Sequence, residues 1–269
     1  MPSFGERLAD GWASAGEITA LAAVPFVLSL TNVDAIARIA AYEGFHISFT
    51  TSLPFSVITV WQFVDPPRTG VFVTSGLPGS SPLAGVAVVL AALAHAVLSA
   101  GYFGRVADHV LGRDRSFLDC VRAYTGSFLV LVTVPYLIFA PLAGRVEGAL
   151  VGLVVVAIPV VLVLGYLFYA APYLVALRDT GVVEALRGSY RLAVGSGSYL
   201  SYTLGFAGLV LAVSPVLSVA VVNVPGVGLL VGVAAGAYLG FVCNVTTMQF
   251  VADIDPATAA GGPEPSEDG

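Results

Sequence analysis

The sequence predicts an all-α integral membrane protein with about six transmembrane helices. Hydrophobic residues make up 57% of its 269 residues, and the mean hydropathy of +0.92 exceeds what a water-exposed surface tolerates. Charged residues make up only 10%, and they cluster between long apolar runs instead of being spread along helical faces. We therefore expect lipid to surround most of the chain and a single transmembrane domain over residues 1–252.

Four apolar runs are long enough to cross a bilayer. A helix rises about 1.5 Å per residue, so about 20 apolar residues span a hydrocarbon core of about 30 Å. The runs that meet this length are residues 83–103, 150–177, 199–222 and 227–251. The last two are separated only by Asn223-Val-Pro-Gly226, which predicts a tight turn between two antiparallel spans.

Two shorter apolar runs, residues 18–33 and 128–143, complete the six spans. Uncharged flanks extend the second run on both sides, whereas the first has no such extension. If either run failed to cross, the count would become odd and the termini would lie on opposite sides. A cleaved signal peptide is an alternative for the first run, but three acidic residues and only Arg7 precede it, which is the wrong charge balance.

Arginine predicts the orientation, because basic residues accumulate on the cytoplasmic side of a membrane. All eleven basic residues are arginine. With six spans and a cytoplasmic N-terminus, eight of them lie inside: Arg7, Arg105, Arg113, Arg115, Arg122, Arg178, Arg187 and Arg191. Three lie outside: Arg38, Arg68 and Arg145. We therefore expect a multi-pass cell-membrane protein with both termini in the cytoplasm.

The net charge of the chain also limits the classes of partner that it can bind. The net charge of -6 argues against nucleic acid as a partner and leaves membrane lipids and other membrane proteins. Residues 253–269 carry five carboxylates, and we expect them to form a disordered acidic cytoplasmic tail. Acidic excess without lysine is typical of haloarchaeal proteomes, although GC-rich codon usage explains the missing lysine equally well.

Residues 44–81 are expected to form the one sizeable non-cytoplasmic excursion. Within them, residues 47–63 mix β-branched and aromatic residues with serine and threonine, Pro54 interrupts the run, and Pro66 marks a turn. We interpret this stretch as a short strand or aromatic lip on the bilayer surface, with a re-entrant segment as the alternative. The polar residues from Ser48 to Ser52 argue against a seventh span.

The chain repeats one unit three times, namely a short amphipathic helix on the cytoplasmic face followed by a transmembrane hairpin. Apolar and aromatic side chains at helical spacing precede each hairpin, so that one face can dip into the headgroup zone. The three lines are Phe4, Leu8 and Trp12; Phe117, Val121 and Tyr124; and Val183, Leu186 and Tyr190.

The opposite faces of these surface helices carry arginine. Asp119 with Arg122 and Glu184 with Arg187 are spaced i, i+3, where a carboxylate and a guanidinium can meet. Guanidinium also donates two parallel hydrogen bonds to phosphate, so Arg122, Arg187 and Arg191 are our candidates for contact with lipid headgroups. Ordinary positive flanks of transmembrane helices are the alternative interpretation.

The segment Val175-Ala-Leu-Arg-Asp-Thr-Gly-Val-Val-Glu-Ala-Leu-Arg-Gly-Ser-Tyr-Arg-Leu192, followed at once by a hairpin, resembles a motif of haloarchaeal multi-pass membrane proteins of unknown function. Those proteins are similar to the membrane domain attached to some bacterial glycerophosphodiester phosphodiesterases. The resemblance covers mainly residues 175–250, with weaker support from residues 117–140 and 53–64. The chain has no room for a phosphodiesterase domain, so the resemblance implies architecture and lipid contact and no catalytic residue.

Two strips of small residues predict close helix packing. In lipid, where apolar burial does not drive helices together, such strips let backbones approach and gain dispersion contacts. One strip comprises Gly228, Gly232, Gly236 and Gly240, and the other comprises Ala92, Ala96 and Ala100. We expect the two strips to pack against each other within the bundle, with homodimerisation as the alternative.

His95 and three tyrosines are candidates for a polar cleft. His95 is ionisable and lies deep in a predicted span, which makes it a functional candidate, although one interhelical hydrogen bond would satisfy a neutral imidazole. Tyr166, Tyr169 and Tyr173 share one helical face, which is typical of an interfacial aromatic belt and also fits the lip of a cleft.

No motif for catalysis, cofactor binding or metal binding occurs in the sequence: there is no Walker loop, dinucleotide fingerprint, HExxH or GxSxG. We therefore expect a non-enzymatic bundle without cofactors that organises membrane or binds a partner and contacts phospholipid headgroups. A small-molecule or lipid permease is the alternative. The sequence does not fix the oligomeric state.

Overall fold

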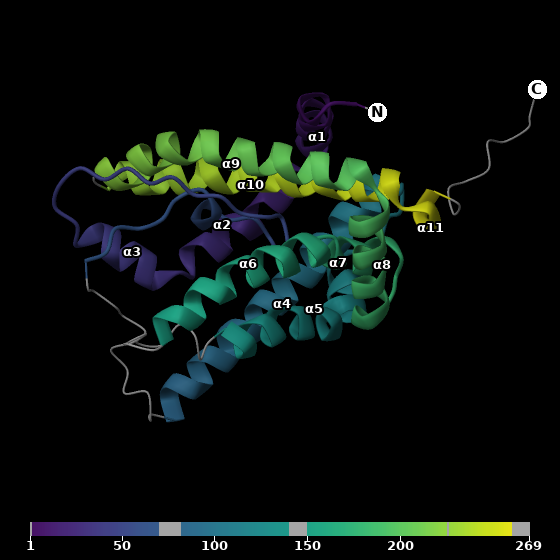
Figure 1. The fold of residues 1–269 in the computed structure, drawn as a ribbon, viewed down its shortest axis with the longest axis horizontal. Helices are drawn as coiled ribbons and strands as arrows, with labels where there is room; N and C mark the ends of the chain where they lie inside the picture. Colours follow the sequence, from purple (N-terminus) through teal and green to yellow (C-terminus); the bar gives the residue numbers. More distant parts are fainter. Residues whose placement is uncertain (1, 70–81, 140–149, 225, 260–269) are drawn as a thin grey trace, which may run out of the picture.

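The computed structural model describes residues 2–69, 82–139, 150–224 and 226–259, and these are mostly helical (Figure 1). Its elements are α1 (Phe4–Glu17), η1 (Thr19–Ala22), α2 (Ala23–Leu30), α3 (Val33–Ala40), η2 (Val60–Gln62), α4 (Pro82–Val110), α5 (Phe117–Phe139), α6 (Leu150–Phe168), α7 (Ala171–Leu177), α8 (Val182–Gly195), α9 (Gly197–Asn223), α10 (Val227–Ile254) and α11 (Pro256–Ala259). The described part of the chain contains no β-strand.

Five helices of the described part are long and apolar enough to cross a membrane. Their apolar stretches are Val89–Val110, Phe117–Val134, Pro159–Leu177, Gly197–Asn223 and Val227–Ile254. A sixth exists if α1 and the helices that follow it are one broken span, because these pass the same test together but bend by 100° at their junction. The predicted all-α class is therefore confirmed, with five to six candidate spans.

Residues 18–33, predicted as one span, belong mostly to this bent pair and do not form one straight helix. Their helical pieces η1 and α2 hold 4 and 8 residues, about 18 Å together, which is short of the hydrocarbon core. Asn32 ends this stretch, because its side-chain oxygen accepts from the backbone N–H of Ala35 at 3.1 Å and caps α3. The fourth predicted span, residues 150–177, is likewise divided, and α7 begins anew with Pro172 in its first turn.

Helices α9 and α10 run side by side along the long axis of the molecule, with α4, α5 and α6 below them in Figure 1. Helix α1 packs on α10 and α9. Gly11 permits this contact, since a Cβ there would lie 2.0 Å from the Thr246 hydroxyl oxygen. At the same place Arg7 donates to Asp253 at 2.7 Å, so the N-terminal helix meets the C-terminal end of α10. Both termini of the described chain therefore lie at one end of the bundle.

That end also gathers the arginines predicted to share one side. They lie on α1, in the last turns of α4, on the α4–α5 connection, at the start of α5 and on the α7–α8 region, whereas Arg38 lies on α3 at the far end (Figure 1). We call it the arginine-rich end. Residues 253–259, expected in a disordered tail, are ordered here as the last turn of α10, the fully buried Asp255 and α11. Residues 260–269 of that predicted tail, and Arg145, are outside the described residues.

Two of the three expected surface helices are separate elements, namely α1 and α8. On α8 the residues Ala185, Gly188, Ser189 and Leu192 are buried, while Val183 and Tyr190 are exposed. The third, beginning at Phe117, is not a separate surface helix, because residues 117–124 are the first turns of the continuous helix α5.

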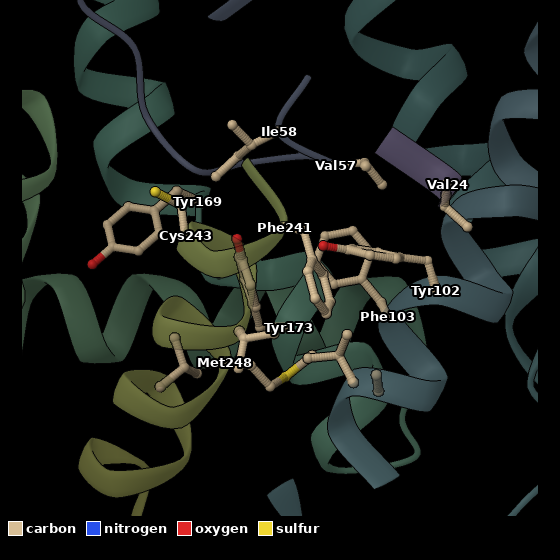
Figure 2. Packing of buried hydrophobic residues seen from close by; sticks show 14 of the residues in the cluster. Val24, Val57, Ile58, Tyr102, Phe103, Tyr169, Tyr173, Phe241, Cys243 and Met248 are labelled. Atoms are coloured by element: carbon tan, nitrogen blue, oxygen red, sulfur yellow. The ribbon is translucent and has the colours of Figure 1, made fainter. Parts of the chain in front are cut away.

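Residues 45–65 form an extended stretch with η2 as their one helical turn; residues 45–55 are mostly exposed or half-buried along α9, whereas residues 57–64 lie inside the bundle, and we call the whole stretch the buried segment after this inner part. Val57, Ile58, Val60, Phe63 and Val64 are at most 1% exposed. Figure 2 shows Val57 and Ile58 above the aromatic side chains of Tyr102, Phe103, Tyr173 and Phe241. The predicted strand does not form in this stretch. Phe45, Phe49 and Phe55 are exposed, as expected of an aromatic lip, whereas residues 57–64 pack between helices.

The glycine strip of α10 explains how the segment fits. Added Cβ atoms at Gly236 and Gly240 would lie 2.6 Å from Val60 Cγ2 and 2.1 Å from the Ile58 carbonyl oxygen. Farther along, Gly228 faces Val224 in the α9–α10 turn and Gly232 faces Val221 near the end of α9. The atoms nearest to the strip therefore belong to the end of α9 and the buried segment, whereas α4, whose alanine strip was its predicted partner, also packs on α10. Of those alanines, Ala96 and Ala100 are fully buried and Ala92 is partly buried.

Candidate functional site

The buried segment enters the bundle along α9, held by side chains. Three alternate backbone N–H groups donate to α9 at 2.7 to 2.9 Å: His46 to Asn223, Ser48 to Ser218, and Thr50 to Ser214. Two residues of extended chain advance about 6.6 Å, and four to five residues of helix advance about 6 to 7.5 Å. The two repeats match, so each second residue meets the next polar side chain of the helix.

The tip of the segment is held by Asn244, a fully buried residue of α10. Its Oδ1 accepts from the backbone N–H of Ile58 at 2.9 Å and from the Tyr102 hydroxyl at 3.1 Å. Its Nδ2 donates to the Ser56 carbonyl at 3.1 Å and to the Tyr173 hydroxyl at 2.7 Å. An N–H group can only donate and a carbonyl can only accept, so these backbone partners fix the orientation of the amide.

The part of the buried segment that follows its tip, residues 60–65, is held by a similar set of hydrogen bonds. Val60 N–H donates to the Ser29 hydroxyl at 3.3 Å, and the Trp61 indole donates to the Ser29 carbonyl at 2.7 Å. This part also meets the part before the tip, because Asp65 N–H donates to the Ser48 hydroxyl at 3.1 Å. Non-helical backbone at the depth of apolar helices requires such partners, since lipid offers none. The re-entrant alternative from the sequence describes this arrangement better than the surface strand.

An open cleft of about 690 Å³ lies against the buried segment, the end of α2 and the middle of α4. Most residues around it are polar, and they include Asn32, Ser52, Gln62, Asp65 and His95. The Ser52 hydroxyl oxygen is buried and has no hydrogen-bond partner among the described residues. A buried polar atom without a partner is uncommon in a folded protein and singles out this cleft for attention.

Of the four residues expected to form a cleft, only His95 lies in it. The Tyr166 hydroxyl donates to the Ala193 carbonyl at 3.0 Å, and Tyr169 stacks on Tyr199 with ring centroids 4.3 Å apart. Tyr173 contacts Asn244, as described above. The three tyrosines therefore pack in the core of the bundle, and the structure does not bring them together with His95.

A charged cluster ties the α4–α5 connection to the α7–α8 turn at the arginine-rich end. Asp108 has a fully buried side chain and accepts from Arg115 Nη2 at 2.6 Å, and Arg113 Nε lies 3.1 Å from it. Both arginines also reach Asp179, at 2.5 and 2.8 Å. Burial raises the pKa of the Asp179 carboxyl, but hydrogen bonds from Tyr124 and Arg115 and the nearby arginine charges outweigh it and lower the pKa. No pattern in the sequence predicts this cluster, which holds the α4–α5 connection against the α7–α8 turn.

A second ion pair joins the end of α7 to the end of α10. Arg178 Nε donates to Asp255 Oδ2 at 2.8 Å, and the same carboxylate accepts from the backbone N–H of Thr258 at 3.2 Å at the start of α11. Burial raises the pKa of the Asp255 carboxyl, but the hydrogen bonds from Arg178 and Thr258 outweigh it and the net pKa is lowered. This carboxylate therefore stabilises the fold in its charged form.

Lowering the pH should weaken the fold through Asp255 and Asp179. Because both carboxyl groups have a lowered pKa in the folded state, the unfolded chain takes up their protons first. Their contribution is complete above the ordinary aspartate pKa of about 4 and is lost as the pH falls through the folded values. We expect a melting temperature that changes little between pH 7 and 5 and falls below about pH 4, measured in detergent.

Asp255→Asn should reduce the stability at pH 7 by about 2 kcal/mol and so lower the melting temperature, because it removes the charged hydrogen bonds to Arg178. It should also reduce the fall in melting temperature at acidic pH. Asp10→Asn, at an exposed position of α1, is the control and should leave both features unchanged. If the melting temperature of Asp255→Asn fell as steeply at acidic pH as that of the parent, a role for this carboxylate would be contradicted.

The three arginines proposed for lipid contact are all exposed, as expected of that role. Arg122 lies 3.4 Å from Asp119 and its side chain is 70% exposed. The expected pair of Glu184 with Arg187 does not form, because Glu184 accepts from the Thr180 hydroxyl at 2.7 Å. Arg187 and Arg191 have no ion-pair or hydrogen-bond partner within the described residues.

Comparisons with models of protein families, with curated proteins and with solved structures gave no match to this chain. Within the described residues, no group of three or more His, Cys, Asp and Glu side chains is placed to hold a metal ion. Cys120 and Cys243 are both buried and unbridged.

Proposed function

We propose that this chain is a non-enzymatic bundle of the cell membrane, with cytoplasmic termini, that contacts phospholipid headgroups and organises membrane or partner proteins. The observation that carries the proposal is the outer face of α8. Val183, Arg187, Tyr190, Arg191 and Val194 are all exposed and share one face of this helix. Apolar side chains beside arginine are typical of a helix that lies in the membrane interface.

The charge around α8 supports the same proposal. Most other arginines at the arginine-rich end are engaged by carboxylates of this chain, whereas Arg187 and Arg191 have no such partner in the described part. One helical turn separates them, so two guanidinium groups can meet one phosphate or neighbouring phosphates. Each basic residue near an anionic surface contributes about 1 kcal/mol of attraction. The proposed cytoplasmic orientation places this face against the anionic leaflet.

The double substitution Arg187→Gln with Arg191→Gln should abolish most stabilisation by anionic lipid. We expect phosphatidylglycerol to raise the melting temperature of the parent protein in mixed micelles and to raise that of the double variant much less. A phosphocholine lipid, which carries no net charge, should change the melting temperatures of the parent and the double variant equally. Arg38→Gln, at the opposite end, is the control for the loss of an arginine elsewhere in the chain. An equal effect of phosphatidylglycerol on parent and double variant would exclude these arginines as the lipid contact.

A small-molecule permease is a second candidate, supported by the buried segment and the cleft. Transporters place unwound backbone and broken helices around substrate sites within the membrane, and residues 45–65 supply such backbone here. Saturable uptake of a solute into liposomes containing the purified protein would favour the permease. Headgroup-dependent stabilisation without uptake would favour the membrane-organising bundle.

A further inference from the structure

We infer that the cleft against the buried segment is a binding site for a small uncharged solute rich in hydroxyl groups, of polyol or monosaccharide size. This inference does not rest on the lipid contact proposed for α8, since the cleft lies among α2, α4 and the buried segment. Its volume of about 690 Å³ falls within the usual range of small-molecule sites, about 300 to 1,000 Å³.

Two amide groups on the cleft are held ready to donate. Gln62 Oε1 accepts from the backbone N–H and the hydroxyl of Thr59 at 2.7 and 2.8 Å, which leaves its NH2 group without a partner in the described chain. Asn32 is held in the same way, because its Oδ1 caps α3 and its NH2 group is left over. Fixed oxygens orient both amides without cost to a ligand, which is what a preorganised site requires.

Ser52 and His95 add groups that work as donor or acceptor. The Ser52 hydroxyl is buried without a partner, and His95 has no hydrogen bond or ion pair within the described residues. A ligand hydroxyl can donate to one such group and accept from another, so a polyol satisfies both kinds at once. The Trp61 ring borders the same cleft, and its bond to Ser29 fixes an apolar surface for the C–H groups of such a ligand.

Charge selects the class of ligand. Among the described residues that line the cleft, Asp65 is the only Asp, Glu, Lys or Arg, and it is exposed. Phosphates and carboxylates would therefore meet a carboxylate and no arginine of the described lining. The cleft therefore disfavours anions, including the headgroups that α8 attracts, and favours neutral solutes with many hydroxyl groups.

Trp61 supplies the probe for a direct test. The chain has two tryptophans, so Trp12→Phe leaves Trp61 as the only source of tryptophan fluorescence. We would reconstitute this background in phospholipid nanodiscs, because sugar-headed detergents would compete, and titrate glycerol, erythritol, glucose and inorganic phosphate. At least one neutral polyol should change the emission to saturation, and phosphate should not. Saturation with phosphate alone, or with none of the four, would overturn the proposal.

Ser52→Ala locates the binding. Since the Ser52 hydroxyl bonds to nothing in the described chain, its removal should not lower the melting temperature, yet it should weaken polyol binding about 3- to 10-fold. His95→Leu should weaken binding by a similar factor. Ser127→Ala on α5, outside the cleft, is the matched control and should bind as the background does. Unchanged affinity in both cleft variants would place the ligand elsewhere and refute the site.

Discussion

Asn244→Leu is expected to destabilise the protein more than any other single substitution considered for this fold. Leucine has a similar size but makes none of the four hydrogen bonds that the Asn244 amide makes to the buried segment, Tyr102 and Tyr173. A buried donor or acceptor left unpaired costs about 1 to 3 kcal/mol, so the loss should reach about 4 kcal/mol or more. Thermal unfolding in detergent measures it directly.

Hydrogen exchange would show where the damage lies. With the Ile58 N–H and Ser56 carbonyl freed, residues 56–60 should exchange much faster than α4 or α9, because the tip of the buried segment has lost its anchor. Gln249→Leu is the matched control, since it removes an amide from the same helix at a partly buried position. If the two substitutions lowered the melting temperature equally, Asn244 would have no special role in holding the segment.

The helical class and the long spans could be predicted because each follows from a property of a continuous run of residues. The runs at 83–103, 199–222 and 227–251 lie within α4, α9 and α10, since about 20 apolar residues without charge suit a membrane helix whatever their neighbours are. The run at 18–33 met the composition but not the length of a straight helix. It is continued by α1 only across a bend of 100° at Ile18, which the apolar pattern does not show, and Asn32 ends it by capping α3.

The path of residues 45–65 could not be predicted in the same way, because it depends on partners far along the chain. The bonds from His46 to Asn223 and from Ile58 to Asn244 join residues 177 and 186 positions apart. A signal was present in hindsight: Ser214, Ser218, Asn223 and Asn244 are polar residues on otherwise apolar spans, which need partners in lipid. They identify helices that bind something polar, but not the segment that they bind.

The site shows the same division between local and distant information. His95 could be selected as a candidate because a lone ionisable residue in an apolar run is conspicuous. The unpaired Ser52 and the oriented amides of Asn32 and Gln62 could not, because serine and amide residues in a loop are ordinary until their surroundings are known. Asp108 was also missed, since its ion pairs matter only once the α4–α5 connection meets the α7–α8 turn.

The glycine strip of α10 leads to the second large expected effect, for Gly240→Ala. The new Cβ would lie 2.1 Å from the carbonyl oxygen of Ile58 and 2.8 Å from its carbonyl carbon. These are backbone atoms, and the N–H of the same residue is held by Asn244, so no side-chain rotation relieves the contact and either the segment or α10 must move. We expect a loss of about 3 kcal/mol, the upper part of the range for overpacked cores, measured as a fall in melting temperature.

Two further glycines make the comparison specific. A Cβ at Gly208 on α9 meets nothing within 4 Å, so Gly208→Ala should be neutral or raise stability by up to about 1 kcal/mol through helix propensity. Gly236→Ala should fall between the two, because its nearest neighbours belong to the Val60 side chain, at 2.6 and 2.9 Å, and a valine can shift slightly. The order of melting temperatures, Gly208→Ala above Gly236→Ala above Gly240→Ala, follows only if the buried segment lies against α10. Equal melting temperatures in the three variants would mean that the segment does not occupy that face.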